Sequence, residues 1–426
     1  MFGNWGPEKR RDSMALLLLL GLVATTEGQN WPRFRGPNGQ GLSDAKTIPV
    51  TWSEQDYRWK VTLPGKGHSS PVIWGDRLFV TCGDEKAVRG TVLCLRAGDG
   101  RELWRKTYDF SRYRFNSLNS FASSTPAVDS DGLYVLWPGA DETTVAALTH
   151  SGDPIWAVKL PGVEARHGAG SSPIVAGECV IVSHEQDKGG GETPSLWLAL
   201  GRRDGAIRWK YEHPENANAS YSTPCLFEDG QGREQLVFTS NLHGIAAMQP
   251  GTGKLLWQVP TALPARVVSS PVICGDRIIG TCGQGGRGVR LAAVTVSGRA
   301  SAKGDEVYGL DRGVTPYVPT SVVHDAWLFA FHDQGTVSCL RGRTGEVIWS
   351  EKPAGRYYGS PVCVDGRLYC ITVDGQVVVL EAGPTYKRLA VNPLGEKSHA
   401  TPAVGAGRMY LRTFSHLVCI GGENQH

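Results

Sequence analysis

Cationic and aromatic side chains recur at one place in this sequence, just ahead of a repeated Ser/Thr–Pro dipeptide. In four copies of that motif a Lys or Arg stands five residues before the proline, and several copies carry a His or Tyr nearby. Cations and aromatic rings together suit an anionic or planar ligand, through charge attraction and stacking. The candidate ligand-binding residues are Lys66, His68, Arg166, His167, Tyr221, Arg266, Tyr317, Arg356, Tyr358, Lys397 and His399. The alternative, that they are ordinary solvated loop residues, stays open.

Other chemistries find less support in the sequence. His68, His167 and His399 belong to different copies of the motif and lack the paired spacing of a metal site. The ten cysteines neither cluster nor follow metal-ligand spacing, and we expect mostly free thiols. The serines that precede the prolines belong to the repeat, so no nucleophile with a partner base can be assigned. We therefore predict no catalytic residue, no metal ligand and no bound cofactor.

Charge and the first residues restrict the compartment and the partners. The net charge is +3 and no run of Lys and Arg exceeds three residues, which argues against a nucleic-acid partner. Basic residues 9–11, the apolar run 15–24 and small polar residues up to Gly28 form the pattern of a secretory signal peptide. The apolar run is too short to span a membrane. No cysteine precedes Cys82, so we predict a periplasmic or secreted protein without a lipid anchor or a transmembrane segment.

A repeat supplies the elements that must position these side chains. Seven copies of the Ser/Thr–Pro motif, with prolines at 71, 126, 173, 224, 271, 361 and 402, and one degenerate copy at 319–322 make eight successive copies. Each copy leads into a short hairpin, clearest at 72–80, where a Gly-Asp pair separates two apolar strands. Such a period indicates a ring or solenoid of similar units.

A second motif lies later in the repeat. In five copies a small residue is followed six positions on by Gly and four further on by Trp, as in Cys94, Gly100 and Trp104. The Gly permits a tight turn, and the Trp can pack between neighbouring units only where the facing residue is small. We expect inter-blade packing by Trp59, Trp104, Trp156, Trp209, Trp257 and Trp349.

These patterns predict an all-β fold, an eight-bladed β-propeller of four-stranded antiparallel blades. The strand around Trp59 has no partners of its own, and the C-terminal strands end the chain with their blade incomplete. Pairing them would close the ring and hide free edges. We expect residues 29–426 to form one domain after a signal peptide at 1–28. The inner strands of a propeller line a central channel, so the candidate residues should converge at one mouth.

The two motifs are similar to the PQQ-like β-propeller repeat of the quinoprotein alcohol dehydrogenase-like superfamily, from about Trp59 to Ile420. The segment 31–39 also resembles the lead-in of exported bacterial members. The family contains quinoprotein dehydrogenases and noncatalytic propellers such as BamB-type scaffolds. For the dehydrogenases, the resemblance implies pyrroloquinoline quinone (PQQ) on a Trp floor, Ca²⁺ held by Glu and Asn oxygens, a catalytic Asp and often an adjacent Cys pair.

The sequence departs from both branches. It has no adjacent Cys pair and no local acidic cluster for Ca²⁺, and its repeats follow one another with little between them. It also lacks the lipidated cysteine of the BamB-type scaffolds. We therefore favour a noncatalytic binding or scaffold module of the bacterial cell envelope with a protein or envelope partner. The alternative is a PQQ/Ca²⁺-dependent dehydrogenase that oxidises an alcohol or a sugar.

Overall fold

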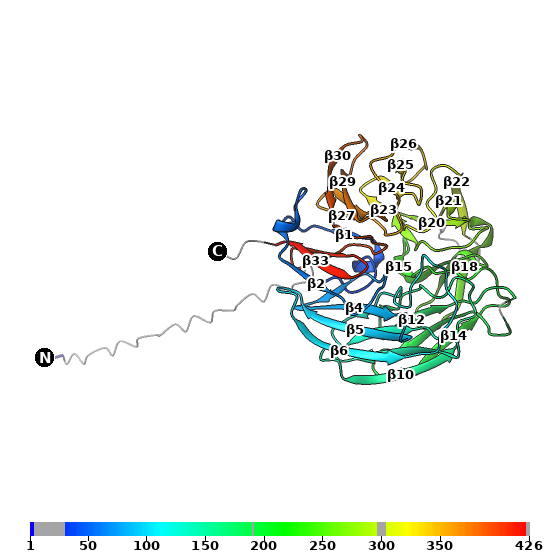
Figure 1. Ribbon diagram of the computed structural model, residues 1–426, viewed down its shortest axis with the longest axis horizontal. Coiled ribbons are helices and arrows are strands. Elements are labelled where there is room, and N and C mark those ends of the chain that lie inside the picture. The colour runs from blue at the N-terminus through cyan, green and yellow to red at the C-terminus, as the bar shows by residue number, and fades with distance from the viewer. Residues whose placement is uncertain (4–29, 190, 296–303, 423–426) are drawn as a thin grey trace.

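The computed structural model describes residues 1–3, 30–189, 191–295 and 304–422. Eight sheets, each with four antiparallel strands, stand around a central axis (Figure 1). The predicted eight-bladed propeller is thereby confirmed. The described residues contain no α-helix and three short 3-10 helices, η2 (Pro37–Gly39), η3 (Glu54–Asp56) and η4 (Pro260–Ala262). The predicted signal peptide lies outside the described residues from position 4 onwards.

Seven blades are each formed by four consecutive strands, which follow one another from the channel outwards. Blades 1 to 4 contain β3 (Val72–Trp74), β4 (Arg77–Asp84), β5 (Arg89–Arg96), β6 (Glu102–Asp109); β7 (Ala127–Val128), β8 (Leu133–Trp137), β9 (Glu142–Leu148), β10 (Pro154–Pro161); β11 (Ile174–Ala176), β12 (Cys179–His184), β13 (Leu196–Gly201), β14 (Ile207–Glu212); and β15 (Cys225–Glu228), β16 (Glu234–Ser240), β17 (Gly244–Met248), β18 (Leu255–Val259). Blades 5 to 7 contain β19 (Val272–Cys274), β20 (Arg277–Gln284), β21 (Arg287–Thr295), β22 (Asp305–Asp311); β23 (Val322–His324), β24 (Trp327–Phe331), β25 (Val337–Arg341), β26 (Val347–Glu351); and β27 (Val362–Val364), β28 (Arg367–Ile371), β29 (Gln376–Glu381), β30 (Arg388–Pro393).

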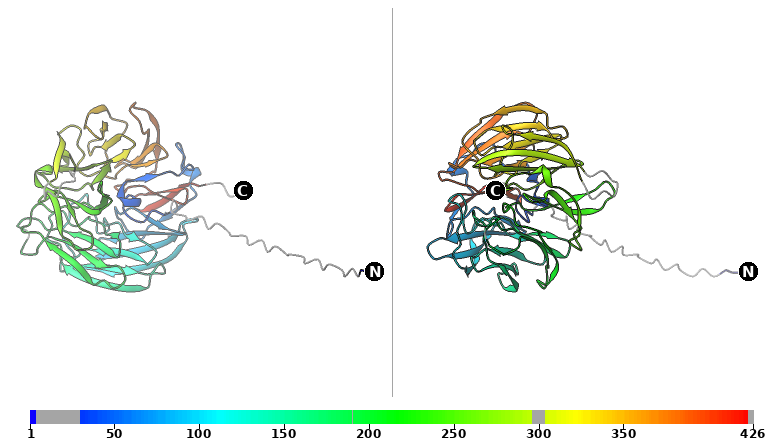
Figure 2. Two further views of the ribbon diagram at one scale, coloured as in Figure 1. Left: turned by 180° about the vertical axis from the view of Figure 1, so that it is seen from behind. Right: turned by 90° about the vertical axis from the view of Figure 1, so that its right-hand side faces the viewer.

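The eighth blade closes the ring with both ends of the chain. It contains β31 (Ala403–Gly405), β32 (Arg408–Arg412), β33 (His416–Gly421) and, outermost, β2 (Trp59–Thr62). Strand β2 pairs antiparallel with β33, and Trp59 lies opposite Cys419. The two further views show this neighbourhood of first and last strands (Figure 2). The predicted closure is confirmed, and it leaves neither strand with an unpaired inner edge.

The hairpins follow from their turn residues. Asp365 (φ 49°) and Gly366 (φ 70°) stand between β27 and β28, with Val364 paired to Arg367. Two successive residues with positive φ make the two-residue turn that matches the twist of a β-hairpin. The turn fixes the register, so Cys363 lies opposite Leu368.

Each outer-strand Trp contacts its own blade and the next one. Trp104 lies opposite Cys94 within blade 1, and its Nε1 donates a 2.9 Å hydrogen bond to His150 O of blade 2. A Cβ added to Gly152 would lie 2.8 Å from the Trp104 ring, so glycine is what permits the contact. The same ring-on-glycine contact joins Trp59 to Gly100, Trp156 to Gly205, Trp209 to Gly253 and Trp257 to Gly304.

Three blades depart from the expected motif, and in blade 7 Ala390 stands at the Trp position, opposite Val379. In blade 2 Trp156 lies opposite Ala147 and not Ala146, because the turn from Leu148 to Pro154 is one residue shorter than the turn from Leu95 to Glu102 in blade 1. In blade 5 a tyrosine replaces the Trp. Tyr308 packs against Gly345 and donates a 2.7 Å hydrogen bond to Gly342 O of blade 6.

A belt of hydroxyls links the blades around the channel. Each motif has a Ser or Thr at the position of Ser70, directly before the proline or its equivalent. At seven of the eight junctions between blades, the hydroxyl of this residue accepts a hydrogen bond of 2.9–3.2 Å from the backbone N–H of the equivalent residue in the preceding blade. At the eighth position, between blades 8 and 1, Ser70 Oγ has no partner among the described residues. The Arg412 guanidinium fills this seam and donates to Ser69 O, Ser69 Oγ and Thr81 O. The hydroxyl belt consists of Ser70, Thr125, Ser172, Thr223, Ser270, Thr320, Ser360 and Thr401.

Residues 31–43, which we call the N-terminal plug, cross the inner strands at one end of the channel. The last part of the plug, β1 (Leu42–Ser43), adds to β27 as a parallel fifth strand. Asn38 donates to and accepts from Leu226 of β15, at 2.8 Å each way. Further hydrogen bonds join the plug to backbone groups of Ile73, Val128, Ile273 and Thr320. The plug therefore satisfies inner-strand edges that would otherwise be open.

Candidate functional site

A cavity of about 440 Å³ lies on the propeller axis beside the hydroxyl belt. Six belt residues line it, one from each of blades 3 to 8, together with Phe34 of the N-terminal plug. This size falls in the range of pockets that hold small molecules. The belt residues in the lining are Ser172, Thr223, Ser270, Thr320, Ser360 and Thr401.

The aromatic and imidazole side chains among the candidate ligand-binding residues line the cavity, and the cationic ones do not. Six of the eleven line it: His68, His167, Tyr221, Tyr317, Tyr358 and His399. The cationic residues do not line it: Lys66, Arg166, Arg266, Arg356 and Lys397. The predicted convergence at one mouth thus holds for side chains from six blades, and their role in ligand binding stays a prediction.

One of those cations is already paired. Arg266 Nη1 lies 3.0 Å from Asp187 Oδ1, and both side chains are largely buried. Asp187 also accepts backbone hydrogen bonds from Arg166 and Ala219. Arg266 reaches the Tyr221 hydroxyl at 3.3 Å and lies over its ring. Asp187 therefore neutralises Arg266, and Arg266 holds Tyr221 in the cavity wall. Arg266 is not a free cation for a ligand.

Across the cavity, two imidazoles and two aromatic rings form a cluster from blades 1, 7 and 8. The rings of His68 and His399 lie 4.6 Å apart, and Phe414 lies 5.5 Å and 5.1 Å from them. Tyr358 meets His399 edge-on at 4.9 Å. Lys66 places its Nζ 4.6 Å from the centre of the Phe414 ring. This wall is apolar in its faces and polar in its edges.

Burial keeps the cavity histidines neutral. It holds the pKa of His68 well below its ordinary value, helped by the nearby His399, Arg412 and Lys66. Burial lowers the pKa of His399 to about 4, and it lowers that of His167 as well. Neutral imidazole has one donor and one acceptor nitrogen. Near pH 7 the cavity thus presents neutral polar groups and aromatic faces.

Comparison with known proteins assigns the chain to a family. The family model for outer membrane protein assembly factor BamB matches residues 88–303 and 295–413, well over half of the chain. The chain belongs to this family. BamB of Yersinia pestis is 23% identical over 324 residues, which are 74% of this chain and 64% of that protein. The match thus spans less than two thirds of the Yersinia protein.

Solved structures give the same fold for BamB-type and quinoprotein propellers. BamB from Moraxella catarrhalis has a TM-score of 0.58 at 14% identity, covering 86% of this chain and 97% of that one. A quinohemoprotein alcohol dehydrogenase from Comamonas testosteroni has a TM-score of 0.67 at 12% identity, covering 94% and 82%. At these identities the likeness establishes the fold alone.

The cavity of this BamB-family chain does not fit PQQ with Ca²⁺. Among the residues that the structure describes, its lining includes Phe34 but no Trp and no carboxylate. Across the described residues, no group of three or more His, Cys, Asp and Glu side chains could hold a metal ion. Ca²⁺ requires six to eight oxygen ligands, mostly from carboxylates and carbonyls. The nearby Asp333 accepts from the backbone N–H groups of Tyr317 and Val318 and is engaged there.

One contributor to the cavity was not predicted from the sequence, the connection 110–126 between β6 and β7, which we call the cap loop. Asn116, Leu118, Asn119 and Ser123 of this loop line the cavity. Four rings pack within it as its own small core: Phe110, Tyr113, Phe115 and Phe121. The expectation that little separates the repeats is therefore wrong here. A signal was present, because Trp104 and Pro126 stand farther apart than the corresponding residues of any later repeat.

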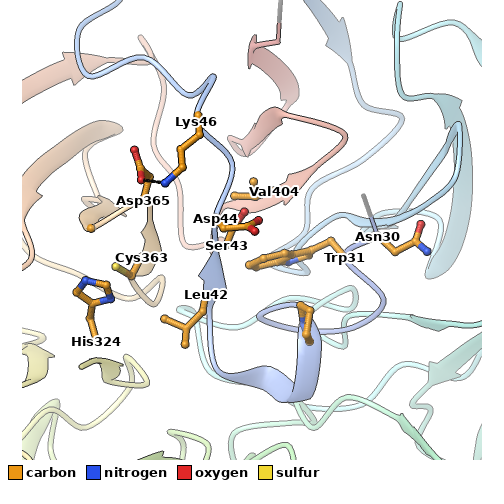
Figure 3. Close-up of a pocket in the computed structure, with 12 residues that line it drawn as sticks. Asn30, Trp31, Leu42, Ser43, Asp44, Lys46, His324, Cys363, Asp365 and Val404 are labelled. Carbon is orange, nitrogen blue, oxygen red and sulfur yellow. Dashed lines mark hydrogen bonds and ion pairs between the residues drawn. The ribbon is translucent and has the colours of Figure 1, made fainter. Parts of the chain in front are cut away.

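A second hollow of about 630 Å³ lies against the N-terminal plug (Figure 3). Trp31 and Leu42 of the plug line it together with His324 of blade 6 and Cys363 of blade 7. Lys46 forms an ion pair with Asp365 at its rim. None of the eleven candidate ligand-binding residues lines this hollow, so the axial cavity is the candidate site.

Proposed function

We propose that this protein is a noncatalytic binding module of the bacterial cell envelope, whose cap-loop mouth binds a protein or envelope partner. The observation that carries the proposal is the makeup of the axial cavity. Loops from around the whole ring contribute neutral polar and aromatic side chains to it, without a carboxylate in the lining. A closed ring of blades is a rigid platform for such loops.

The family supports the envelope setting. The BamB of Yersinia pestis is named for outer membrane protein assembly, and we propose a related scaffold role here. The basic and apolar pattern of residues 9–28 supports export to the periplasm. In the described residues, none of the helices has the length and apolar character to cross a membrane.

The dehydrogenase alternative has weaker support. The quinohemoprotein alcohol dehydrogenase shares the fold at 12% identity, and a shared fold at this identity is no evidence for a shared activity. The side chains that would hold Ca²⁺ are not among those lining the axial cavity.

The cap loop offers the sharpest test. Leu118 at its tip is 49% exposed although it is a large apolar residue, and its carbonyl lies 3.4 Å from His399 Nδ1. We would replace Leu118 with a photocrosslinking phenylalanine analogue in the native envelope. A matched control carries the analogue at Ile207, which is 55% exposed on outer strand β14.

The proposal expects a discrete crosslinked species from position 118 that does not form from position 207. Crosslinks of equal yield from both positions would indicate non-specific contact. Their absence from position 118 would remove the cap-loop mouth as the docking face.

A further inference from the structure

Three arginines are buried around the axial channel without a counter-charge. Arg35 and Arg412 are fully buried and Arg33 is 6% exposed. Their guanidinium groups donate to backbone carbonyls, to the Ser69 hydroxyl and to the Cys82 sulfur. Within the part of the chain that the structure describes, none of the three forms an ion pair. A buried charge without a partner of opposite sign is costly, so the site favours an anion nearby.

All three guanidiniums adjoin residues of the cavity wall. Arg35 donates to the carbonyl of Thr320, whose side chain lines the cavity. Arg33 donates to Pro224 O, next to the lining residue Thr223. Arg412 donates to Ser69, next to His68. Burial lowers the pKa of Arg33 to about 10 and that of Arg35 to about 9, so both stay protonated at neutral pH.

The cavity also holds a polar side chain that has nothing to bind. Both ring nitrogens of His68 are buried and neither has a hydrogen-bond partner among the described residues. The ring lies in the cavity wall between His399 and Phe414. The neutral ring has one N–H donor, and a ligand oxygen that accepts from it would recover the free energy lost by leaving a buried donor unpaired.

We propose that the axial cavity binds a small organic anion directly, without a divalent metal, with its acidic group at His68 and its apolar part against the aromatic wall. This inference goes beyond the partner docking proposed above, because it concerns a small ligand inside the cavity and not a partner at its mouth. The described lining contains no carboxylate that would repel an anion or recruit a cation. Its polar side chains are those of Asn, Ser, Thr, Tyr and neutral His residues. The field of Arg33, Arg35, Arg412 and Lys66 then selects an anion over a neutral ligand of equal shape.

Two probes of nearly the same shape, one anionic and one neutral, test this. We would titrate the mature protein with 2-naphthoate and with neutral 2-naphthamide by calorimetry, in a chelator and then in excess Ca²⁺. His68→Leu removes both unpaired nitrogens, and His324→Leu in the plug-side hollow is its matched control. Lys66→Gln removes a partly exposed cation, and Lys254→Gln, at an exposed position just before outer strand β18, is its control.

We expect naphthoate to bind at least about tenfold more tightly than naphthamide, a difference of about 1.4 kcal/mol, with no effect of Ca²⁺. His68→Leu and Lys66→Gln should weaken naphthoate while both controls bind as the unmodified protein does. Equal binding of the two probes, binding only with Ca²⁺, or no naphthoate binding at millimolar concentration would overturn the ligand class. Crosslinking from position 118 tests partner docking independently of naphthoate binding.

Discussion

The backbone N–H of Ser360 donates a 2.9 Å hydrogen bond to Oγ1 of Thr401, the equivalent residue of the next blade. The same bond recurs around the ring, so each blade uses a side chain of its neighbour to satisfy a buried N–H. The proline that follows cannot donate a hydrogen bond of its own. The Ser/Thr–Pro motif is therefore the inner inter-blade joint, and the Trp–Gly contact is the outer one.

The inner joint predicts a specific loss on Thr125→Val. The variant keeps the shape of the side chain but leaves the buried Ser70 N–H unpaired, which should lower the free energy of unfolding by about 1–3 kcal/mol. Thr143→Val is the control, because Thr143 Oγ1 is buried and already has no partner among the described residues. Urea unfolding should show that Thr143→Val costs nothing. Equal losses from both variants would refute the role of the belt.

The outer joint predicts a loss on Gly152→Ala. The new Cβ would lie 2.8 Å from the Trp104 ring, at a backbone φ of 91°. Gly177→Ala, at φ 54° with open space around its Cβ, isolates the backbone term, which is roughly 1–2 kcal/mol. Chemical unfolding should therefore find Gly152→Ala clearly the more destabilising of the two. If the two variants unfold at the same denaturant concentration, the ring-on-glycine contact does not stabilise the ring.

Glu185 predicts a pH dependence of stability. Its oxygens accept from Trp197 Nε1 at 3.0 Å and from the backbone N–H of Ser220 at 3.1 Å, beside Tyr221. Burial raises its pKa from 4.5 to about 7. The folded protein then holds this proton more tightly than the unfolded chain, so its contribution to stability is lost as the pH rises from 4.5 through 7.

Thermal melts of the unmodified protein and of Glu185→Gln between pH 4.5 and 8 measure this effect. The melting temperature of the variant relative to the unmodified protein should rise with pH across that window. Glu234→Gln, at an exposed position, should follow the unmodified protein at every pH. A difference between Glu185→Gln and the unmodified protein that is constant with pH would contradict the raised pKa.

Much of the frame could be predicted from local spacing. Some motifs act within one repeat, so the turns and strand pairs that they form could be predicted from local sequence. Examples are the turn residues Asp365-Gly366 and the spacing of Cys94, Gly100 and Trp104. Ring closure followed from the strand at Trp59 lacking partners. The one-residue shift at Trp156 was missed because Ala146 and Ala147 are both small, so the sequence does not show that the turn between β9 and β10 is one residue shorter.

The site was harder to predict because its contacts join distant segments. Arg266 has the motif spacing of a free cation, yet Asp187 of another repeat neutralises it. Arg33 and Arg35 precede the repeats, and only the closed ring puts them at the channel. The cap loop has its own aromatic core, which repeat spacing cannot describe.

The measurement that tests the central claim most directly is titration of the mature protein with PQQ, with and without Ca²⁺, alongside dye-linked alcohol oxidation. A noncatalytic module predicts no dye reduction and no rise in melting temperature that depends on Ca²⁺. Saturable Ca²⁺-dependent binding together with dye reduction would contradict the account and make the axial cavity the cofactor site of a dehydrogenase.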